Sequence, residues 1–125
     1  AVAGVKNKRV YDLGSGDGRI VIMAAAEASA AYGIEIEPLK WLTSTIRIRA
    51  RNIKNAKIYR DSFFTRDIRD AEIVFIFLPQ ETVDKLQPKF KKLRKGTKII
   101  CHVSKCQELK LVKELKKNKI YVYKI

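Results

Sequence analysis

The fold of this 125-residue chain is decided by the stretch Val10-Tyr11-Asp12-Leu13-Gly14-Ser15-Gly16-Asp17-Gly18-Arg19, followed by Ile20-Val21-Ile22-Met23-Ala24-Ala25-Ala26. A short apolar segment with an acid near its end runs into three glycines at alternate positions and then into helix-favouring residues. This order predicts a strand, a tight turn and a helix. The glycines permit positive φ and leave room for a ligand against the main chain, and Asp17 is placed to cap the helix.

The spacing of the glycines in this turn limits the class of ligand that it can bind. A dinucleotide-binding turn reads Gly-x-Gly-x-x-Gly and places a pyrophosphate at the helix N-terminus. Residues 12–18 instead read Asp-x-Gly-x-Gly-x-Gly, whose leading acid repels a pyrophosphate but suits an ammonium group. Residues 32–38, Tyr-Gly-Ile-Glu-Ile-Glu-Pro, predict a second strand that ends in acids, where such folds bind a ribose diol. A ligand with an amino acid part and a ribose is indicated, and S-adenosylmethionine has both.

The bulk composition fits a globular chain, with 46% hydrophobic residues. We expect residues 1–125 to form one domain, and a start at Ala1 suggests a chain trimmed at its N-terminus. No apolar run approaches the roughly 20 residues that span a bilayer and no signal peptide is visible, so we expect a cytoplasmic protein without a membrane span. Cys101, Cys106 and His102 do not make a four-ligand set, so we expect no metal site and two reduced cysteines.

The charge is strongly basic, with 27 Lys and Arg against 13 Asp and Glu, a net charge of +14. Such a charge favours polyanionic partners, although a solvated Lys-rich face gives the same composition. Three arginines, Arg47, Arg49 and Arg51, end one predicted helix and could face solvent or nucleic acid. The oligomeric state is not determined by these patterns.

Strands and helices alternate along the chain, which predicts an α/β protein with a doubly wound, mainly parallel sheet. The expected strands cover residues 8–13, 31–36, 56–60, 72–78 and 97–103, and the expected helices cover 18–28, 39–52 and 82–93. We expect no full helix between 60 and 72, and a kink or a new helical piece at Pro88. Spacings of three and four place one buried helix face on Leu39, Leu42, Thr43, Ile46 and Ala50. Residues 108–123 fit either a helix or a hairpin.

The chain resembles the class I (seven-β-strand) S-adenosylmethionine-dependent methyltransferases. Within them it is most similar to small archaeal protein-lysine methyltransferases and to their relatives that methylate a lysine of the mitochondrial ATP-synthase c-subunit. The resemblance is carried by residues 12–21, by residues 32–38 with the Arg-rich helix end at 47–51, and by Val74-Phe75-Ile76-Phe77-Leu78-Pro79-Gln80. It implies a Rossmann-like methyltransferase sheet with a C-terminal antiparallel hairpin.

The predicted sheet brings five acids to its carboxyl edge, which suits a cationic ligand: Asp12, Asp17, Glu35, Glu37 and Asp61. The resemblance implies S-adenosylmethionine as cofactor and S-adenosylhomocysteine as product. The resemblance also implies that Asp12 anchors the ammonium group, that Glu35 accepts from the ribose hydroxyls and that Asp61 accepts from the adenine amino group. The remaining cofactor-binding residues supply backbone and apolar contacts: Gly14, Ser15, Gly16, Gly18, Ser62 and Phe63.

A lysine substrate must lose its proton before methylation, and an apolar mouth favours the neutral amine. Phe77, Leu78 and Pro79 are of this type, and Gln80 or Glu81 is placed to orient the amine or accept its proton. Protein substrates, some of them nucleic-acid-associated, are therefore favoured. The alternatives are an RNA or DNA methyltransferase and a binding module without catalysis. Against the former, residues 78–81 lack the Asn/Asp-Pro-Pro-aromatic pattern of amine-directed nucleic-acid enzymes, and there is no Pro-Cys.

Overall fold

The computed structural model describes residues 4–125. Its regular elements alternate along the chain much as predicted, with three α-helices, seven strands and one short 3₁₀ turn among the described residues. In order they are β1 (Arg9–Leu13), α1 (Arg19–Ala25), β2 (Ala30–Ile34), α2 (Pro38–Ala50), β3 (Ala56–Tyr59), β4 (Ile73–Ile76), α3 (Gln80–Lys91), β5 (Lys98–His102), β6 (Lys110–Leu115), the 3₁₀ turn Lys116–Asn118 and β7 (Ile120–Lys124).

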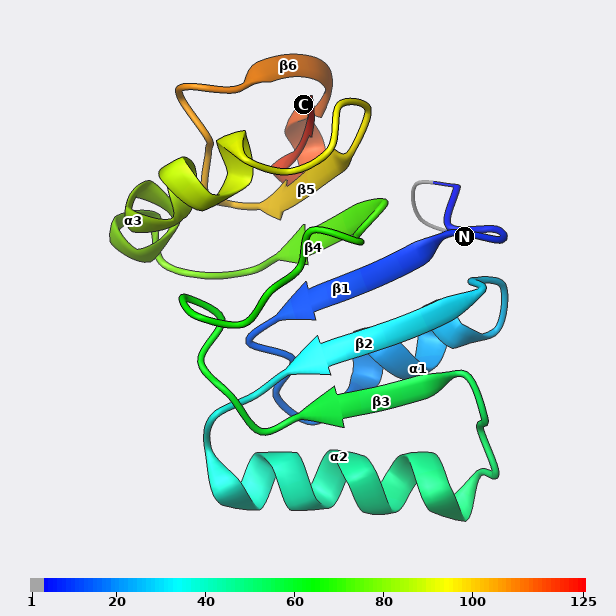
Figure 1. The fold of residues 1–125 in the computed structure, drawn as a ribbon. Helices are drawn as coiled ribbons and strands as arrows, with labels where there is room; N and C mark the ends of the chain where they lie inside the picture. The colour runs from blue at the N-terminus through cyan, green and yellow to red at the C-terminus, as the bar shows by residue number, and fades with distance from the viewer. Residues whose placement is uncertain (1–3) are drawn as a thin grey trace.

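The strands form one mixed sheet in the order β3-β2-β1-β4-β5-β7-β6 (Figure 1). The first five strands of this order are parallel, and β7 runs antiparallel between β5 and β6. The doubly wound sheet and the C-terminal antiparallel hairpin are both confirmed. The strand order reverses between β1 and β4, and ligands of open α/β sheets bind outside the carboxyl ends of the strands at such a point.

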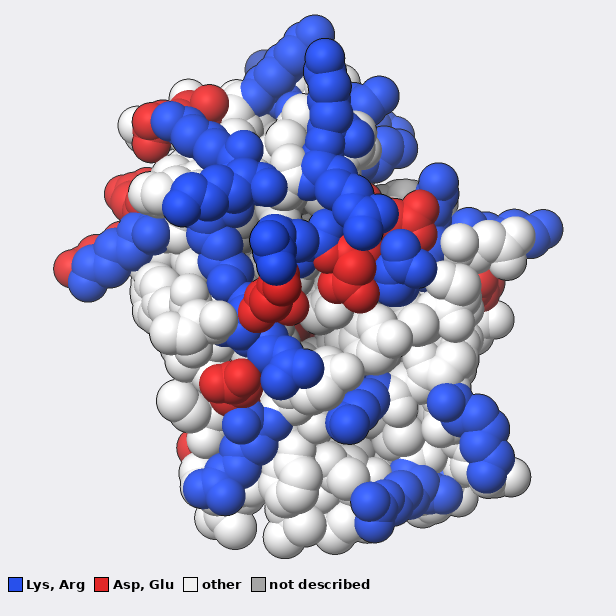
Figure 2. All heavy atoms as spheres, in the orientation of Figure 1, with Lys and Arg blue, Asp and Glu red and all other residues white. Residues whose placement is uncertain are grey.

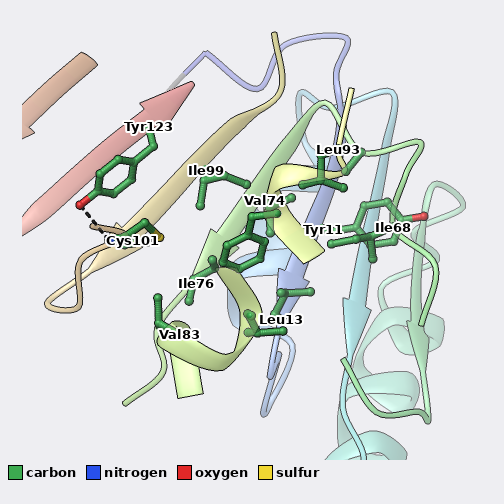
Figure 3. Close-up of a cluster of buried hydrophobic side chains, with 14 of the residues drawn as sticks. Tyr11, Leu13, Ile68, Val74, Ile76, Val83, Leu93, Ile99, Cys101 and Tyr123 are labelled. Atoms are coloured by element: carbon green, nitrogen blue, oxygen red, sulfur yellow. Dashed lines mark hydrogen bonds between the residues drawn. The ribbon is translucent and has the colours of Figure 1, made fainter. Parts of the chain in front are cut away.

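Helices cover both faces of the sheet, with α1 behind it and α3 in front of it in Figure 1. Alternate residues of β1 therefore enter different cores. Val10 packs in the cluster on the α1 side, whereas Tyr11 and Leu13 pack in the cluster on the α3 side. Figure 3 shows the α3-side cluster, in which the Tyr123 hydroxyl accepts a hydrogen bond from the Cys106 amide (3.0 Å).

The predicted buried face of α2 is wrong. Leu39, Leu42 and Ile46 are 70%, 46% and 55% exposed, and Thr43 and Ala50 are exposed too. The helix is instead turned so that Ser44 and Ile48 are buried. The reason is a tertiary contact: α2 approaches the glycine turn so closely that a Cβ on Gly18 would lie 2.8 Å from the Ser44 Cβ, and spacing alone does not reveal that contact.

Two prolines lie in the helices, one at the start of α2 and one inside α3. Pro38 begins α2 as expected, where its missing N–H costs nothing. Pro88 lies inside α3, which is one helix from Gln80 to Lys91, so no second piece starts there.

The connection from β3 to β4 contains no helix, as predicted, and it leaves the α3-side face of β2 and β3 without a helical cover. No helix among residues 4–125 is both long and apolar enough to cross a membrane.

Candidate functional site at the carboxyl edge of the sheet

The glycine turn after β1 is attached to the end of β2. The amides of Gly14 and Ser15 both donate to the Ile34 carbonyl, at 2.9 and 3.1 Å. Gly14, Gly16 and Gly18 have φ of +73°, +57° and +80°, a region that other residues enter only with strain. The alternate glycines therefore let the chain turn sharply while its backbone stays at the sheet edge.

Gly33 in β2 is what allows this turn to lie so close. A Cβ at Gly33 would come within 2.5 Å of the Ser15 Oγ and 2.6 Å of the Ile58 Cδ1. No role was predicted for Gly33 from the sequence, although a glycine inside a strand pattern is a known sign of close backbone approach. Ser15 itself is buried, and its Oγ has no hydrogen-bond partner within residues 4–125.

Glu35 connects the two strand ends. Its carboxylate accepts hydrogen bonds from the Gly16 amide (2.8 Å) and from the Glu37 amide (3.0 Å), and the residue is only 9% exposed. A carboxylate can accept about four hydrogen bonds, so capacity remains for a ligand. Glu35 thus has a structural role that sequence analysis missed, beside the ribose contact predicted for it.

Asp12 is the other buried acid of this edge, with 7% of its surface exposed. Its carboxylate has no hydrogen-bond or ion-pair partner among the described residues. Burial raises the pKa of Asp12 to about 7, and the nearby negative charges of Glu35 and Asp17 add to that rise. A buried acid without a counter-charge is the feature expected where a cationic ligand completes the site.

Asp12 opens into an apolar groove of about 270 Å³ between α1 and the carboxyl ends of β4 and β5. Met23 and Phe77 on its walls are 64% and 69% exposed. The Phe77 ring packs against the His102 ring, with the ring centroids 4.7 Å apart. Such a groove, with apolar walls and few polar groups, is the usual form of a small-molecule or side-chain binding site.

The other three predicted acids serve local structure. Asp17 accepts from the Arg19 amide at the start of α1 (3.1 Å) and pairs with Arg19 and Arg47, which together hold the pKa of Asp17 below its usual value. Glu37 caps α2 by accepting from the Lys40 amide (2.8 Å). The structure therefore separates the five acids into two buried ones and three that are engaged at the surface.

Asp61 follows β3 and stays near the surface. It accepts from the Ser62 amide (2.8 Å) and lies 3.5 Å from the Arg66 guanidinium. Phe63 and Leu78 meet at the glycine turn: the position of a Cβ on Gly14 would lie 3.7 Å from the Phe63 ring and 3.1 Å from the Leu78 side chain. The end of β4 and the segment after β3 thus supply apolar cover beside the turn.

Pro79 and Gln80 start α3, immediately after Leu78. The Gln80 side chain donates to the Lys105 carbonyl (2.6 Å) and accepts from the Lys105 amide (2.8 Å). It also donates to Asp84 (2.9 Å). Gln80 therefore connects the loop after β4 to the loop after β5, and its amide group is already engaged where a substrate amine was predicted to meet it.

The predicted cofactor can be tested against these groups. The ammonium group of a ligand would meet the unpartnered Asp12 carboxylate, and ligand hydroxyls would meet the Glu35 carboxylate, which has hydrogen-bonding capacity left. The side-chain-free edge of the glycine turn leaves its backbone open to a flat or extended ligand. The residues present therefore fit S-adenosylmethionine.

Residues 12–113 match the ANTKMT methyltransferase domain family. The chain belongs to this family. A curated relative, the protein-lysine N-methyltransferase of Saccharolobus islandicus, is 37% identical over 97 residues, which cover 74% of this chain and 60% of that protein. The ATP synthase c-subunit lysine N-methyltransferase of Caenorhabditis elegans is 30% identical over 96 residues, which cover 76% of this chain and 50% of that protein. The match thus spans between half and three fifths of these two relatives.

Solved structures show the same architecture. The RNA methyltransferase of Salinibacter ruber, in complex with S-adenosyl-L-homocysteine, aligns with a TM-score of 0.88 at 30% identity, covering 99% of this chain and 85% of that one. A ribosomal protein L11 methylase of Lactobacillus delbrueckii aligns with a TM-score of 0.81 at 14% identity, covering 98% and 71%. The ANTKMT domain described here thus has the Rossmann-like methyltransferase sheet that the sequence predicted.

Proposed function

We propose that this protein is an S-adenosylmethionine-dependent methyltransferase that acts on lysine ε-amines of proteins. The observation that carries the proposal is the Asp12 carboxylate, which is buried at the glycine turn without a partner among residues 4–125. Membership of the ANTKMT family and the 37% identity to a protein-lysine N-methyltransferase support the reaction class and the lysine acceptor.

The cofactor would supply the methyl group from a positively charged sulfur. Asp12 would bind its ammonium group and Glu35 its ribose hydroxyls, while the backbone of Gly14, Ser15, Gly16 and Gly18 would pass beneath it. Asp61, Ser62 and Phe63 would hold the adenine. Because methyl transfer is an in-line displacement, these residues act mainly by alignment, and a charge on the buried Asp12 or Glu35 carboxylate would interact strongly with the ligand.

The acceptor side has to favour a neutral amine. With a pKa near 10.4, only roughly one lysine in a few thousand is neutral at pH 7. Phe77, Leu78 and Pro79 would line an apolar mouth that disfavours the ammonium form. Gln80 would position this mouth through its bonds to Lys105 rather than touch the amine itself.

RNA methylation is the second candidate, favoured by one observation. The Salinibacter ruber RNA methyltransferase matches nearly all of this chain at 30% identity. Against it, residues 78–81 read Leu-Pro-Gln-Glu, which lacks the Asn or Asp before the proline and the aromatic ring that hold an exocyclic amine of a base. We therefore rank protein lysine first.

For partners and location we propose protein substrates, including nucleic-acid-associated ones, in the cytoplasm. The net charge of +14 supports acidic or nucleic-acid-bound targets. Two buried free cysteines, with sulfur atoms 3.4 Å apart, support a reducing compartment.

The test is methyl transfer from tritiated S-adenosylmethionine into a cell extract, with the Asp12→Asn variant as the matched control. We expect label that proteases remove and nucleases leave, located on lysine by mass spectrometry and lost in the variant. Label that nucleases remove would replace the protein assignment by the RNA one. Equal labelling by the variant would contradict the role of Asp12.

A further inference from the structure

A row of tyrosines crosses the uncovered part of the sheet on its α3 side. Tyr11, Tyr32 and Tyr59 come from the adjacent strands β1, β2 and β3, with successive ring centroids 5.0 and 5.8 Å apart. No helix joins β3 to β4 (Figure 1), so no helix from that connection covers the row at its β3 end. Tyr11 is buried, whereas Tyr32 and Tyr59 are partly exposed.

Two grooves meet at Tyr59. The first, of about 650 Å³, follows the β3 edge beside α2, and its aromatic walls are Tyr32, Trp41 and Tyr59. The charged residues that line it within the described part of the chain are all basic: Arg49, Lys54 and Lys57. The second, of about 660 Å³, continues from Tyr59 along the β3–β4 connection toward the end of α3. Each groove is large enough for a nucleotide-sized group.

The second groove contains both signs of charge, but its acids are already paired. Asp67 binds the Arg69 guanidinium (2.9 Å), and Asp70 accepts from the Tyr11 hydroxyl (2.7 Å). By contrast, five basic residues along the two grooves have no acidic partner within 4 Å among residues 4–125: Arg49, Lys54, Lys57, Lys92 and Arg94. Figure 2, which views this face, shows Lys and Arg around a mostly uncharged surface over β2 and β3.

Two basic side chains of this surface lie over the ring of Tyr59. The Arg66 guanidinium lies 3.6 Å from the centroid of the Tyr59 ring, and the Lys57 ammonium lies 4.9 Å from it. Nucleobases stack on aromatic rings and on guanidinium planes, while neighbouring cations bind the phosphates between them. An acidic peptide would use the cations but would leave the flat rings without a matching group.

We propose that a single-stranded nucleic acid docks on this surface, with a base stacked on the Arg66 guanidinium that covers the Tyr59 ring and its phosphates along Lys54 and Lys57. The surface lies at the β3 edge and the apolar groove beside Asp12 lies on the α1 side, but Arg66 pairs with Asp61 (3.5 Å), so the surface begins next to the proposed adenine site. The proposal does not rest on methyl transfer, because it is tested by binding alone.

The test is fluorescence anisotropy with a labelled oligouridylate of about a dozen nucleotides, without methyl donor. The first variant, Lys54→Ala with Lys57→Ala, removes two exposed cations from the surface. Its matched control is Lys116→Ala with Lys117→Ala, which removes two exposed cations from the turn between β6 and β7. We expect the first variant to weaken binding and to lower the salt slope by about 1.4, at about 0.7 per phosphate contact, and the control to do neither.

Stacking is tested separately with Tyr59→Leu, which keeps apolar volume but removes the ring. We expect a loss of at least about fivefold in affinity with the salt slope unchanged, as the loss of one stacked base predicts. Thermal unfolding of each variant checks that the fold persists. No binding by the wild-type chain, equal losses in the control, or an unaffected Tyr59→Leu variant would overturn the proposal. Displacement by polyglutamate as effective as by unlabelled oligouridylate would also overturn it.

Discussion

The two halves of the carboxyl edge are built in different ways. At β1 and β2, buried groups are held by main-chain contacts: Glu35 accepts from Gly16, and Gly33 makes room for Ser15. At β4 and β5, the surface is exposed and apolar, with Phe77 69% exposed. The proposed donor side is therefore preorganised with the fold, whereas the proposed acceptor side is open. Changes at the first should therefore affect folding and donor binding, and changes at the second should affect turnover alone.

The largest effect should come from the charge of Asp12. Its pKa rises from 3.8 to about 7 in the folded chain, so ionisation opposes folding as the pH rises through that window. Stability attributable to this group is thus fully present below pH 4 and is lost above pH 7, by up to about 4 kcal/mol. Asp12→Asn lacks this loss, so its free energy of unfolding relative to wild type should increase between pH 5 and pH 8. Urea titrations at both pH values check it, and parallel curves for the two proteins would contradict it.

The next largest effect should follow from closing the space at Gly33. Gly33→Ala places a methyl group within 2.6 Å of both Ser15 and Ile58, and both neighbours belong to packed elements. We expect a loss of about 3 kcal/mol in the free energy of unfolding, the upper end for overpacking, together with weaker donor binding. Gly96→Ala is the control, because its Cβ meets no neighbour and costs only the strain of φ +95°, about 1–2 kcal/mol. An alanine at 33 that is tolerated better than one at 96 would show that the turn does not need this close approach.

A smaller effect should distinguish two neighbouring acids. The two carboxylate oxygens of Glu35 each accept from a main-chain N–H, and Glu35→Gln replaces one of them with an NH₂ group. One main-chain N–H then loses its acceptor, which should lower the free energy of unfolding by about 2 kcal/mol. The affinity for the methyl donor should fall as well. Glu37→Gln, two residues along, keeps an oxygen for the exposed α2 cap and should change the free energy of unfolding by only a few tenths of a kcal/mol. Urea unfolding measures the stability of the two variants and calorimetry measures their methyl-donor affinity. Equal changes in both variants would contradict the different roles of Glu35 and Glu37.

The smallest effect on stability is expected on the acceptor side. Phe77→Ala trims an exposed ring and should change the free energy of unfolding by less than about 0.5 kcal/mol. The initial rate of methyl transfer to protein should nevertheless fall several-fold, because the mouth loses apolar surface. Leu39→Ala, whose side chain on α2 is 70% exposed, is the matched control and should retain full activity. If both variants transfer methyl groups at the wild-type rate, Phe77 has no part in the acceptor site.

Features that depend on local sequence could be predicted, whereas contacts between distant segments could not. The strand–turn–helix at 10–26, the strand alternation and the missing helix after β3 follow from local patterns, and the structure has them. The packed side of α2 did not follow, because it depends on Ser44 meeting Gly18 across the fold. The Gln80–Lys105 bonds were missed for a similar reason, since they join residues 25 positions apart. Contacts between distant segments leave no periodic signal.

The most direct test of the account is the pH dependence of S-adenosylhomocysteine binding by calorimetry between pH 5 and pH 7. The ligand's ammonium group stays charged in this range. If Asp12 receives that group, the carboxyl must lose its proton first, so wild-type affinity should fall by up to about tenfold for each pH unit below the pKa of about 7. Asp12→Asn should bind more weakly, with a flat profile. A variant that binds as tightly as wild type, or that shows the same pH profile, would contradict the account.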